Sequence, residues 1–180
     1  MHLVKINNGK VKQLLNFTEK ECEEYDFSEL YKGILAINGN DASKLFRVRL
    51  FVQTDNKKET LKFFSQKRKE SAIKKRMFMA LNSVLTGKRD NDLYEIEVRD
   101  VVENIKVSIG AIKFHAQENF RIVCREYPLM KEIIIVMIEA CPKKGQRNSD
   151  DAAYNNKLNA AKRIRHYYKE KDTGNKIFIQ

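Results

Sequence analysis

An apolar run leads directly into a basic loop in the stretch Ile133-Ile134-Ile135-Val136-Met137-Ile138-Glu139-Ala140-Cys141-Pro142-Lys143-Lys144-Gly145-Gln146-Arg147. Six consecutive apolar residues have the length of a buried β-strand. A second basic segment, 156–169, follows and is interpreted as a helix. A buried strand followed by Lys143, Lys144 and Arg147 would hold these cations at one sheet edge, where they suit phosphate oxygens. The stretch therefore indicates a nucleic-acid ligand.

The length and composition are those of one globular domain. With 180 residues, 42% of them hydrophobic, the chain can bury a core. No apolar run approaches the roughly 18 residues of a membrane span, and the first eight residues lack the apolar region of a secretory signal. We therefore expect a cytoplasmic protein that does not associate with membranes. The cysteines form no CxxC pair, which argues against a zinc ribbon or a disulfide framework, and we expect three buried thiols: Cys22, Cys124 and Cys141.

The net charge of +11 is unevenly distributed. Residues 1–45 contain six Lys or Arg and seven Asp or Glu, so residues 46–180 carry a net charge of +12. Such an excess attracts a polyanion over long range, with binding that weakens as salt rises. Charge alone does not distinguish RNA from DNA.

Residues 1–41 are predicted to form an acidic N-terminal extension. A hairpin is expected over 3–11, because Asn8-Gly9 favours a tight turn. The acidic segment 17–25 is expected to be a helix capped by Thr18, and 31–37 a strand. The turn-rich run 38–41 marks the boundary.

Beyond that boundary, 42–180 is predicted to be a single α+β domain. Alternating and helical patterns predict the following order: strand 46–52, helices 59–65 and 67–86, strand 93–99 with 101–109 as its continuation or as a separate strand, strands 111–115, 120–125 and 133–138, and a terminal helix from about 150 with an apolar stripe of Tyr154, Leu158, Ala161, Ile164 and Tyr168. We therefore predict an antiparallel meander sheet packed against two or three helices, preceded by the small extension.

This order, with certain local strings, resembles the RelE/ParE toxin superfamily, and most closely its HigB-like, phage-derived branch. The resemblance covers about residues 45–170. It is carried by these strings: Phe46-Arg47-Val48-Arg49-Leu50-Phe51, Asn56-Lys57-Lys58-Glu59-Thr60-Leu61-Lys62-Phe63-Phe64, Leu93-Tyr94-Glu95-Ile96-Glu97-Val98, Phe120-Arg121-Ile122-Val123-Cys124, Ala140-Cys141-Pro142-Lys143-Lys144 and the basic run 157–165.

The resemblance implies a toxin of a type II toxin–antitoxin system. Such a toxin is an endoribonuclease that cleaves mRNA on the ribosome, needs no metal or cofactor, and is held inactive by a cognate antitoxin. In this chemistry the 2′-hydroxyl attacks the neighbouring phosphate, so cations stabilise the transition-state charge. The resemblance places Arg121 on the family's strand arginine and Lys143 and Lys144 on its paired lysines. Arg147 would join Arg121 in stabilising the phosphate.

Two positions depart from the family's pattern. Glu97 stands where an arginine is expected, with Arg99 two places later on the same strand face. Cys124 stands where a tyrosine is expected. Both departures argue against cleavage more than against the fold.

Further candidates complete the predicted site. His115 has the intrinsic pKa of a general acid or base and would share a strand face with Lys113, beside Arg121. Tyr167 could stack on a base, although core packing of the Tyr167-Tyr168 pair is the simpler interpretation. Nucleic-acid contacts are assigned to these cations: Arg99, Lys113, Lys74, Lys75, Arg163 and Arg165.

Three alternatives stay open. The chain could be a non-catalytic nucleic-acid-binding or adaptor domain on the same scaffold, or a gyrase-directed relative within the superfamily. The acidic segment 17–31 could also lie across the basic site and mimic RNA or an antitoxin.

Overall fold

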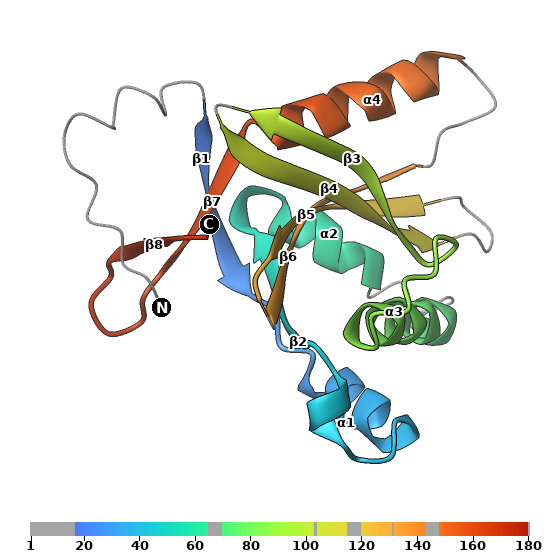
Figure 1. Cartoon of the computed structure of the whole chain (residues 1–180). Coiled ribbons are helices and arrows are strands. Elements are labelled where there is room, and N and C mark those ends of the chain that lie inside the picture. Colours follow the sequence, from blue (N-terminus) through green and yellow to red (C-terminus); the bar gives the residue numbers. More distant parts are fainter. Residues whose placement is uncertain are drawn as a thin grey trace.

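The computed structural model describes residues 17–64, 70–102, 104–114, 120–130, 132–142 and 148–179. In chain order its elements are β1 (Thr18–Glu24), α1 (Ser28–Ile37), η2 (Ala42–Lys44), β2 (Arg47–Gln53), η3 (Thr54–Asn56), α2 (Lys57–Phe64), α3 (Glu70–Leu85), β3 (Tyr94–Val102), β4 (Ile105–Phe114), β5 (Phe120–Pro128), β6 (Glu132–Pro142), α4 (Asn148–Lys162), β7 (Ile164–Lys169) and β8 (Lys176–Phe178) (Figure 1). The hairpin predicted over 3–11 lies outside the described residues.

The strands form one mixed sheet in the order β3-β4-β5-β6-β2-β1-β7-β8. Strands β3 to β6 form the expected antiparallel meander. Two parallel pairs then interrupt the antiparallel pattern, because β2 runs parallel to β6 and β1 parallel to β7. The prediction of a simple antiparallel meander packed on helices was therefore wrong. The prediction missed the β2–β6 and β1–β7 pairs because strands that are far apart in the sequence pair without producing any local pattern of residues.

The sheet is curled like half of a barrel, as one contact across it shows. The Tyr127 hydroxyl on β5 lies 2.9 Å from Nδ1 of His166 on β7. Three strands separate β5 from β7, and in a flat sheet four intervals of about 4.8 Å would hold them about 19 Å apart. The sheet must therefore curl toward the face that carries these two side chains.

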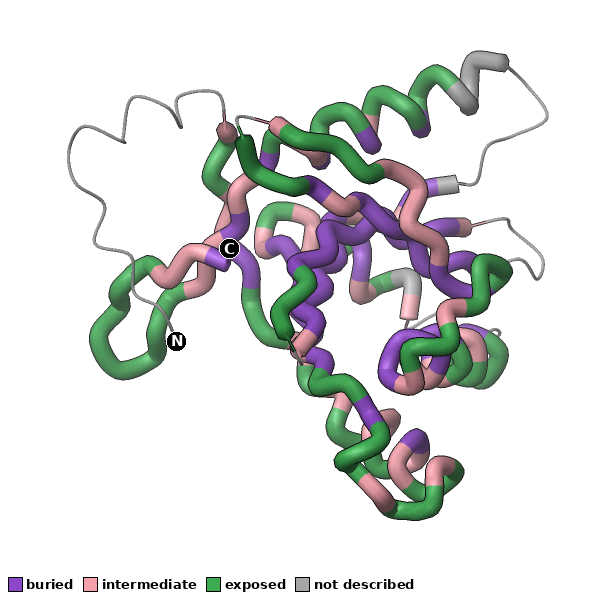
Figure 2. The backbone as a smooth tube through the Cα atoms, viewed as in Figure 1, coloured by how far each residue is buried: buried purple, intermediate pink, exposed green. Residues whose placement is uncertain are grey.

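Helices cover the two faces of the sheet differently (Figures 1 and 2). Helix α4 packs on the curled-in face, where Tyr154 and Leu158 join a core cluster with Val107, Val123 and Ile164. Helices α2 and α3 pack on the opposite face, and α1 lies beyond the end of β2 against α3; the largest cluster combines residues of all three helices with alternate residues of the strands. We call these the α4 face and the three-helix face. Buried segments concentrate in the central strands in Figure 2.

Several predicted elements are present within a few residues of their expected limits. The alternating run at 46–52 is β2, the two helices are α2 and α3, and the opening stretch contains β6. The runs 101–109 and 111–115 were predicted separately, but β4 joins most of both into one strand, Ile105–Phe114. Gly87, with φ of 70°, follows α3 as expected of a residue that ends a helix.

The N-terminal elements differ from the prediction. The acidic segment is strand β1, not a helix, and it lies between β2 and β7. Its outward carboxylates pair with cations of neighbouring elements: Glu19 with Lys176, Glu21 with Lys169 and Glu23 with Lys57. Residues 31–37 belong to helix α1, not to a strand. The division of the chain at residue 41 stays a prediction, with β1 on its N-terminal side hydrogen-bonded to strands on the other side.

The predicted terminal helix is divided between two elements. Helix α4 ends at Lys162, and residues 164–169 form β7. Ile164 and Tyr168 fit a helical stripe by spacing, but they also alternate with Arg165, Tyr167 and Lys169 as a strand requires. Parallel pairing of Ile164 with Thr18, far away in the sequence, selects the strand.

Candidate nucleic-acid interface

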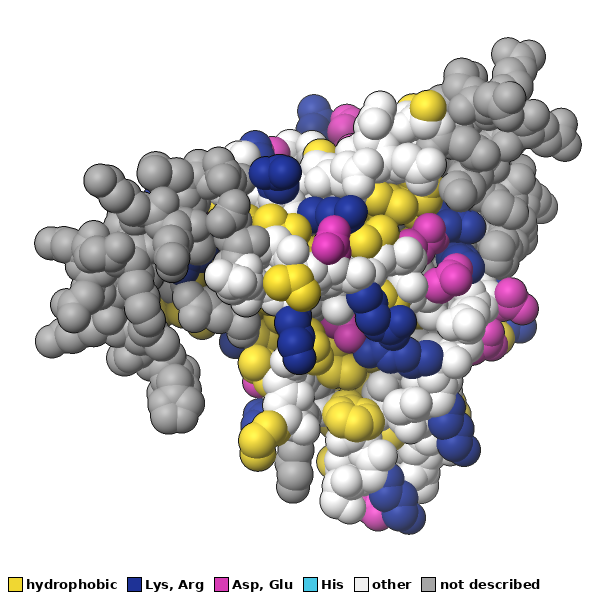
Figure 3. All heavy atoms as spheres, turned by 45° about the horizontal axis from the view of Figure 1, so that its top comes forward, with side chains coloured by type: hydrophobic (Ala, Val, Ile, Leu, Met, Phe, Trp, Pro, Cys, Tyr) yellow, Lys and Arg dark blue, Asp and Glu magenta, His cyan; other side chains and the backbone are white. Residues whose placement is uncertain are grey.

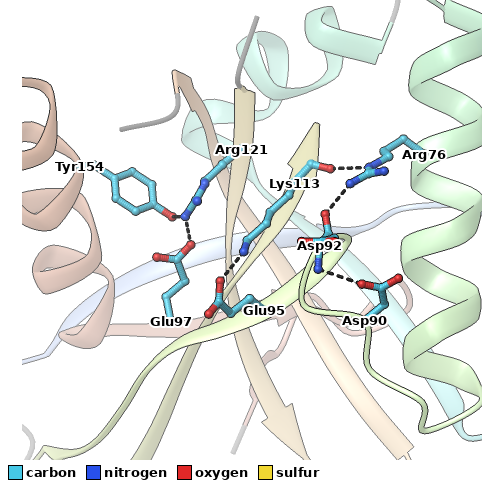
Figure 4. A network of polar contacts seen from close by, with 8 residues as sticks. All are labelled: Arg76, Asp90, Asp92, Glu95, Glu97, Lys113, Arg121 and Tyr154. Atoms are coloured by element: carbon cyan, nitrogen blue, oxygen red, sulfur yellow. Dashed lines mark hydrogen bonds and ion pairs between the residues drawn. The ribbon is translucent and has the colours of Figure 1, made fainter. Parts of the chain in front are cut away.

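Arg121, the predicted phosphate ligand, is buried on the α4 face, where it contacts Glu97 and Tyr154 (Figure 4). It lies on β5 with 8% of its surface exposed, and its guanidinium is ion-paired with Glu97 of β3. Tyr154 of α4 covers it, with the ring centroid 5.3 Å from the guanidinium carbon. Burial alone would lower the pKa of Arg121, but the Tyr154 hydroxyl and Glu97 together raise it. The guanidinium is therefore held charged and already has an anionic partner.

The partner of Arg121 explains one departure from the family's pattern. Glu97 stands where the resemblance expects an arginine, and it neutralises the cation that the resemblance assigns to the phosphate. A second ion pair runs alongside, because Lys113 on β4 pairs with Glu95 on β3. Lys113 was predicted to contact nucleic acid, but it is 8% exposed. Both cations therefore link strands across the sheet.

Cys124, the second departure, is fully buried on the three-helix face. Burial raises the pKa of its thiol. Burial likewise raises the pKa of Cys22 to about 12 and of Cys141 to about 11. All three cysteines are buried free thiols, as the sequence predicted.

The loop residues of the predicted catalytic set, His115, Lys143, Lys144 and Arg147, lie outside the described residues. The register does fix where their loops start. Phe120 pairs with Phe114 on one side and with Pro142 on the other, so the ends of β4 and β6 flank the start of β5. His115 and Lys143 directly follow two of these strand ends in the sequence.

The remaining predicted contact residues are distributed over the molecule. Lys74 and Lys75 are exposed on α3, and Arg99 is exposed on β3 at the edge of the sheet. Arg163 lies in the turn after α4, and Arg165 lies on β7 with its guanidinium over the Phe178 ring. These residues therefore do not form one cluster with Arg121.

The net positive charge is concentrated on α2, α3 and their connection. Residues 57–85 contain nine Lys or Arg and two Glu, a net charge of +7 out of +11 for the chain. The described helices carry exposed Lys58, Lys62, Lys74 and Lys75, with Glu59 also exposed. Within the described ranges, Lys58 and Lys75 have no ion-pair partner. Arg76 differs, because it donates hydrogen bonds to the backbone carbonyls of Lys113 and Asp92 (Figure 4).

The lysines of α4, β7 and β8 are used differently. Lys157 pairs with Glu139 at 2.9 Å and Lys162 with Asp100 at 3.0 Å. Lys169 and Lys176 pair with carboxylates of β1. On the face shown in Figure 3, Lys and Arg side chains occur in separate groups with acidic and hydrophobic side chains between them. The predicted basic terminal segment is therefore largely compensated by acidic neighbours.

Sequence reasoning missed the role of His166, which was placed on the terminal helix. It is 0% exposed on β7, bonded through Nδ1 to Tyr127 and through Nε2 to Gln53. Burial, with Arg125 nearby, lowers the pKa of His166 to about 3. Its alternation with Arg165 and Tyr167 was the signal that would have placed it on a buried strand face.

Arg125 was also missed. It is 2% exposed and has no carboxylate partner in the described part of the chain. Its Nη1 donates to the carbonyl oxygens of Ala161 and Lys162, where the negative end of the α4 dipole favours a cation. Nevertheless, burial lowers the pKa of Arg125. This residue anchors the end of α4 to β5.

Among the described residues no group of three His, Cys, Asp or Glu side chains could hold a metal ion. None of the described helices is long and apolar enough to cross a membrane. No protein-family model, curated protein or solved structure matches the chain. The resemblance to the toxin superfamily therefore stays a prediction.

Proposed function

We propose that the protein is a non-catalytic nucleic-acid-binding protein that holds phosphates on the exposed side of α2 and α3. The observation that carries the proposal is the distribution of charge. Residues 57–85 supply a net +7, whereas the lysines of the C-terminal elements pair with carboxylates. Lys58 and Lys75, which have no ion-pair partner among the described residues, bind phosphates at little cost, because no ion pair has to be broken.

The state of Arg121 supports a binding role over a cleaving one. A catalytic arginine must reach the reacting phosphate, but Arg121 is covered by Tyr154 and paired with Glu97. Releasing it would leave a buried carboxylate without its partner, which is costly. The ribonuclease hypothesis keeps one supporting observation, the adjacent strand ends that precede His115 and Lys143. Ribosome association and an antitoxin partner stay predictions of the resemblance.

The test measures binding of a fluorescein-labelled RNA of about 20 nucleotides by anisotropy over a series of salt concentrations. Replacing Lys58 and Lys75 by Gln should weaken binding about tenfold at low salt. It should also lower the slope of log affinity against log salt by about 1 for each phosphate that is no longer bound. The matched control replaces Lys88 and Lys106 by Gln. Both lysines are exposed and lie outside α2 and α3, so the control removes the same charge as the Lys58 and Lys75 substitutions.

Equal weakening by both pairs of substitutions would show that only net charge matters, and would overturn the α2–α3 site. Absence of binding by the unmodified protein at low salt would overturn nucleic-acid binding itself. The same RNA, run on a denaturing gel after incubation with the protein, should stay intact. Specific cleavage would instead favour the ribonuclease.

A further inference from the structure

Strands β7 and β8 present aromatic and cationic side chains on the three-helix face. Along β7, Arg165 and Tyr167 alternate with the buried His166, so they lie on the side of the sheet opposite to it. Phe178 of β8 is the register partner of Tyr167, and their ring centroids are 5.7 Å apart. The guanidinium carbon of Arg165 lies 3.7 Å from the centroid of the Phe178 ring, and Lys176 Nζ lies 4.5 Å from that of Tyr167.

These side chains are accessible. Arg165, Tyr167 and Phe178 are half-buried, whereas Lys169 and Lys176 are exposed. Buried core packing would hide the planar groups, as it hides Tyr154. Binding of a single-stranded nucleic acid requires planar groups and cations. Unpaired bases stack on aromatic rings or guanidinium planes, and the cations contact the phosphates.

Carboxylates also lie on this surface. Glu19 and Glu21 of β1 are register partners of Arg165 and Tyr167, and they pair with Lys176 at 3.4 Å and Lys169 at 2.9 Å. The Tyr167 hydroxyl lies 3.5 Å from Glu21. Such accessible ion pairs contribute little free energy, so Lys169 and Lys176 can exchange their carboxylates for phosphates at a small cost, which unpaired Lys58 and Lys75 do not have.

The surface is continuous with the basic helices. Glu23 on the same side of β1 is ion-paired with Lys57 at the start of α2. A nucleic-acid strand that crosses α2 and α3 would therefore meet β1, β7 and β8 next on the same face of the sheet.

We propose that the β7–β8 surface, consisting of Arg165, Tyr167, Lys169, Lys176 and Phe178, binds unpaired bases of a single-stranded nucleic acid. One base stacks on the Arg165 guanidinium, which Phe178 supports from below, and the next base stacks on Tyr167. Lys169 and Lys176 contact the intervening phosphates. This inference rests on the proposed nucleic-acid binding and adds that the ligand is single-stranded.

The test compares U12 RNA, dT12 DNA and a 12-base-pair RNA duplex, each labelled with fluorescein, in anisotropy titrations at fixed salt. Arg165→Lys keeps the charge but removes the plane, and Tyr167→Leu keeps apolar bulk but removes the ring. Each should weaken U12 binding about tenfold and leave duplex binding unchanged. The matched controls are Arg47→Lys and Tyr31→Leu, an exposed arginine and a half-buried tyrosine elsewhere in the molecule. Thermal unfolding confirms that each variant is folded.

The outcomes separate the two proposals. If U12 binds with unchanged affinity to folded Arg165→Lys and Tyr167→Leu, the stacking surface is overturned while nucleic-acid binding stands. If the duplex binds as tightly as U12 and responds equally to both substitutions, the single-stranded specificity is overturned. If no probe binds to the unmodified protein, both proposals fail. Comparison of U12 with dT12 shows whether the 2′-hydroxyl contributes.

Discussion

At the scale of single residues, the Glu97–Arg121 pair decides how the site is interpreted. Both side chains are almost completely buried, at 11% and 10% exposed. Removing one member of a buried ion pair leaves an uncompensated charge, whereas removing both often costs little. A structural role for Arg121 therefore makes a quantitative prediction about stability.

Glu97→Met is expected to lower the free energy of unfolding by roughly 3 kcal/mol, and Arg121→Met by a similar amount. The double variant Glu97→Met/Arg121→Met should be more stable than either single variant. Urea unfolding monitored by circular dichroism measures all four proteins, and the double-mutant cycle gives the coupling energy. Additive losses would show that the two residues do not act as a pair, and would reopen the phosphate role of Arg121.

Sequence analysis singled out both Glu97 and Arg121 but did not predict that they form an ion pair. Glu97 was noted as a departure from the family's pattern, and Arg121 as a candidate ligand. Their contact spans three strands, since β4 lies between β3 and β5. The spacing of residues in the sequence does not predict which side chains contact each other across an intervening strand.

At the scale of elements, sequence periodicity predicted the elements whose own residue pattern determines their secondary structure. Strand β2 alternates, and α3 has an apolar stripe that includes Ile73, Met77 and Leu81, so both were recognised. Strand β1 was interpreted as a helix because most of its residues are charged. It is a strand because β2 and β7 supply its hydrogen bonds, while cations of β2, β7, β8 and α2 pair with its carboxylates. Such non-local stabilisation overrides intrinsic preference.

The Tyr127–His166–Gln53 contact joins three such elements, β5, β7 and β2, and makes stability depend on pH. The unfolded chain protonates this imidazole near its ordinary pKa of 6.5, whereas the folded protein keeps it neutral down to about pH 3. Between these values the unfolded state binds more protons. Stability should therefore fall as pH falls, by up to about 1.4 kcal/mol per pH unit from this group.

Urea unfolding at pH 7.5, 6.5, 5.5 and 4.5 measures this dependence. His166→Gln retains a donor and an acceptor but does not titrate, so its stability should fall less steeply below pH 6.5, although it starts lower. Parallel curves for the two proteins would show that His166 is not the titrating group.

At the scale of the whole molecule, the position of β1 inside the sheet changes what truncation would reveal. If residues 1–41 were a separate extension, removal of residues 1–40 would test whether the acidic segment masks a basic site. In the structure that deletion removes the strand between β2 and β7, including buried Cys22 and the ion pairs of β1.

The deletion is therefore expected to abolish cooperative unfolding, which thermal melts and near-ultraviolet circular dichroism would detect. A matched control inserts four Gly or Ser residues into the exposed turn at 172–174, where tolerance is expected. A truncated protein that still unfolds cooperatively near the original temperature would show that β1 is dispensable and would restore the extension as a separate unit.

The parallel pairing of β1 with β7 also has a consequence for how the chain is made. Thr18 pairs with Ile164, 146 residues later, so the contact order of this part of the sheet is high. Such topologies fold slowly, because distant segments must meet before their contacts can repay the entropy of loop closure. A ribosome synthesises β1 about 146 residues before β7, so over that interval the nascent chain carries β1 without one of its two neighbours. This sheet is thus completed only after β7 has been synthesised, and until then the like charges of the acidic strand β1 discourage edge-to-edge aggregation.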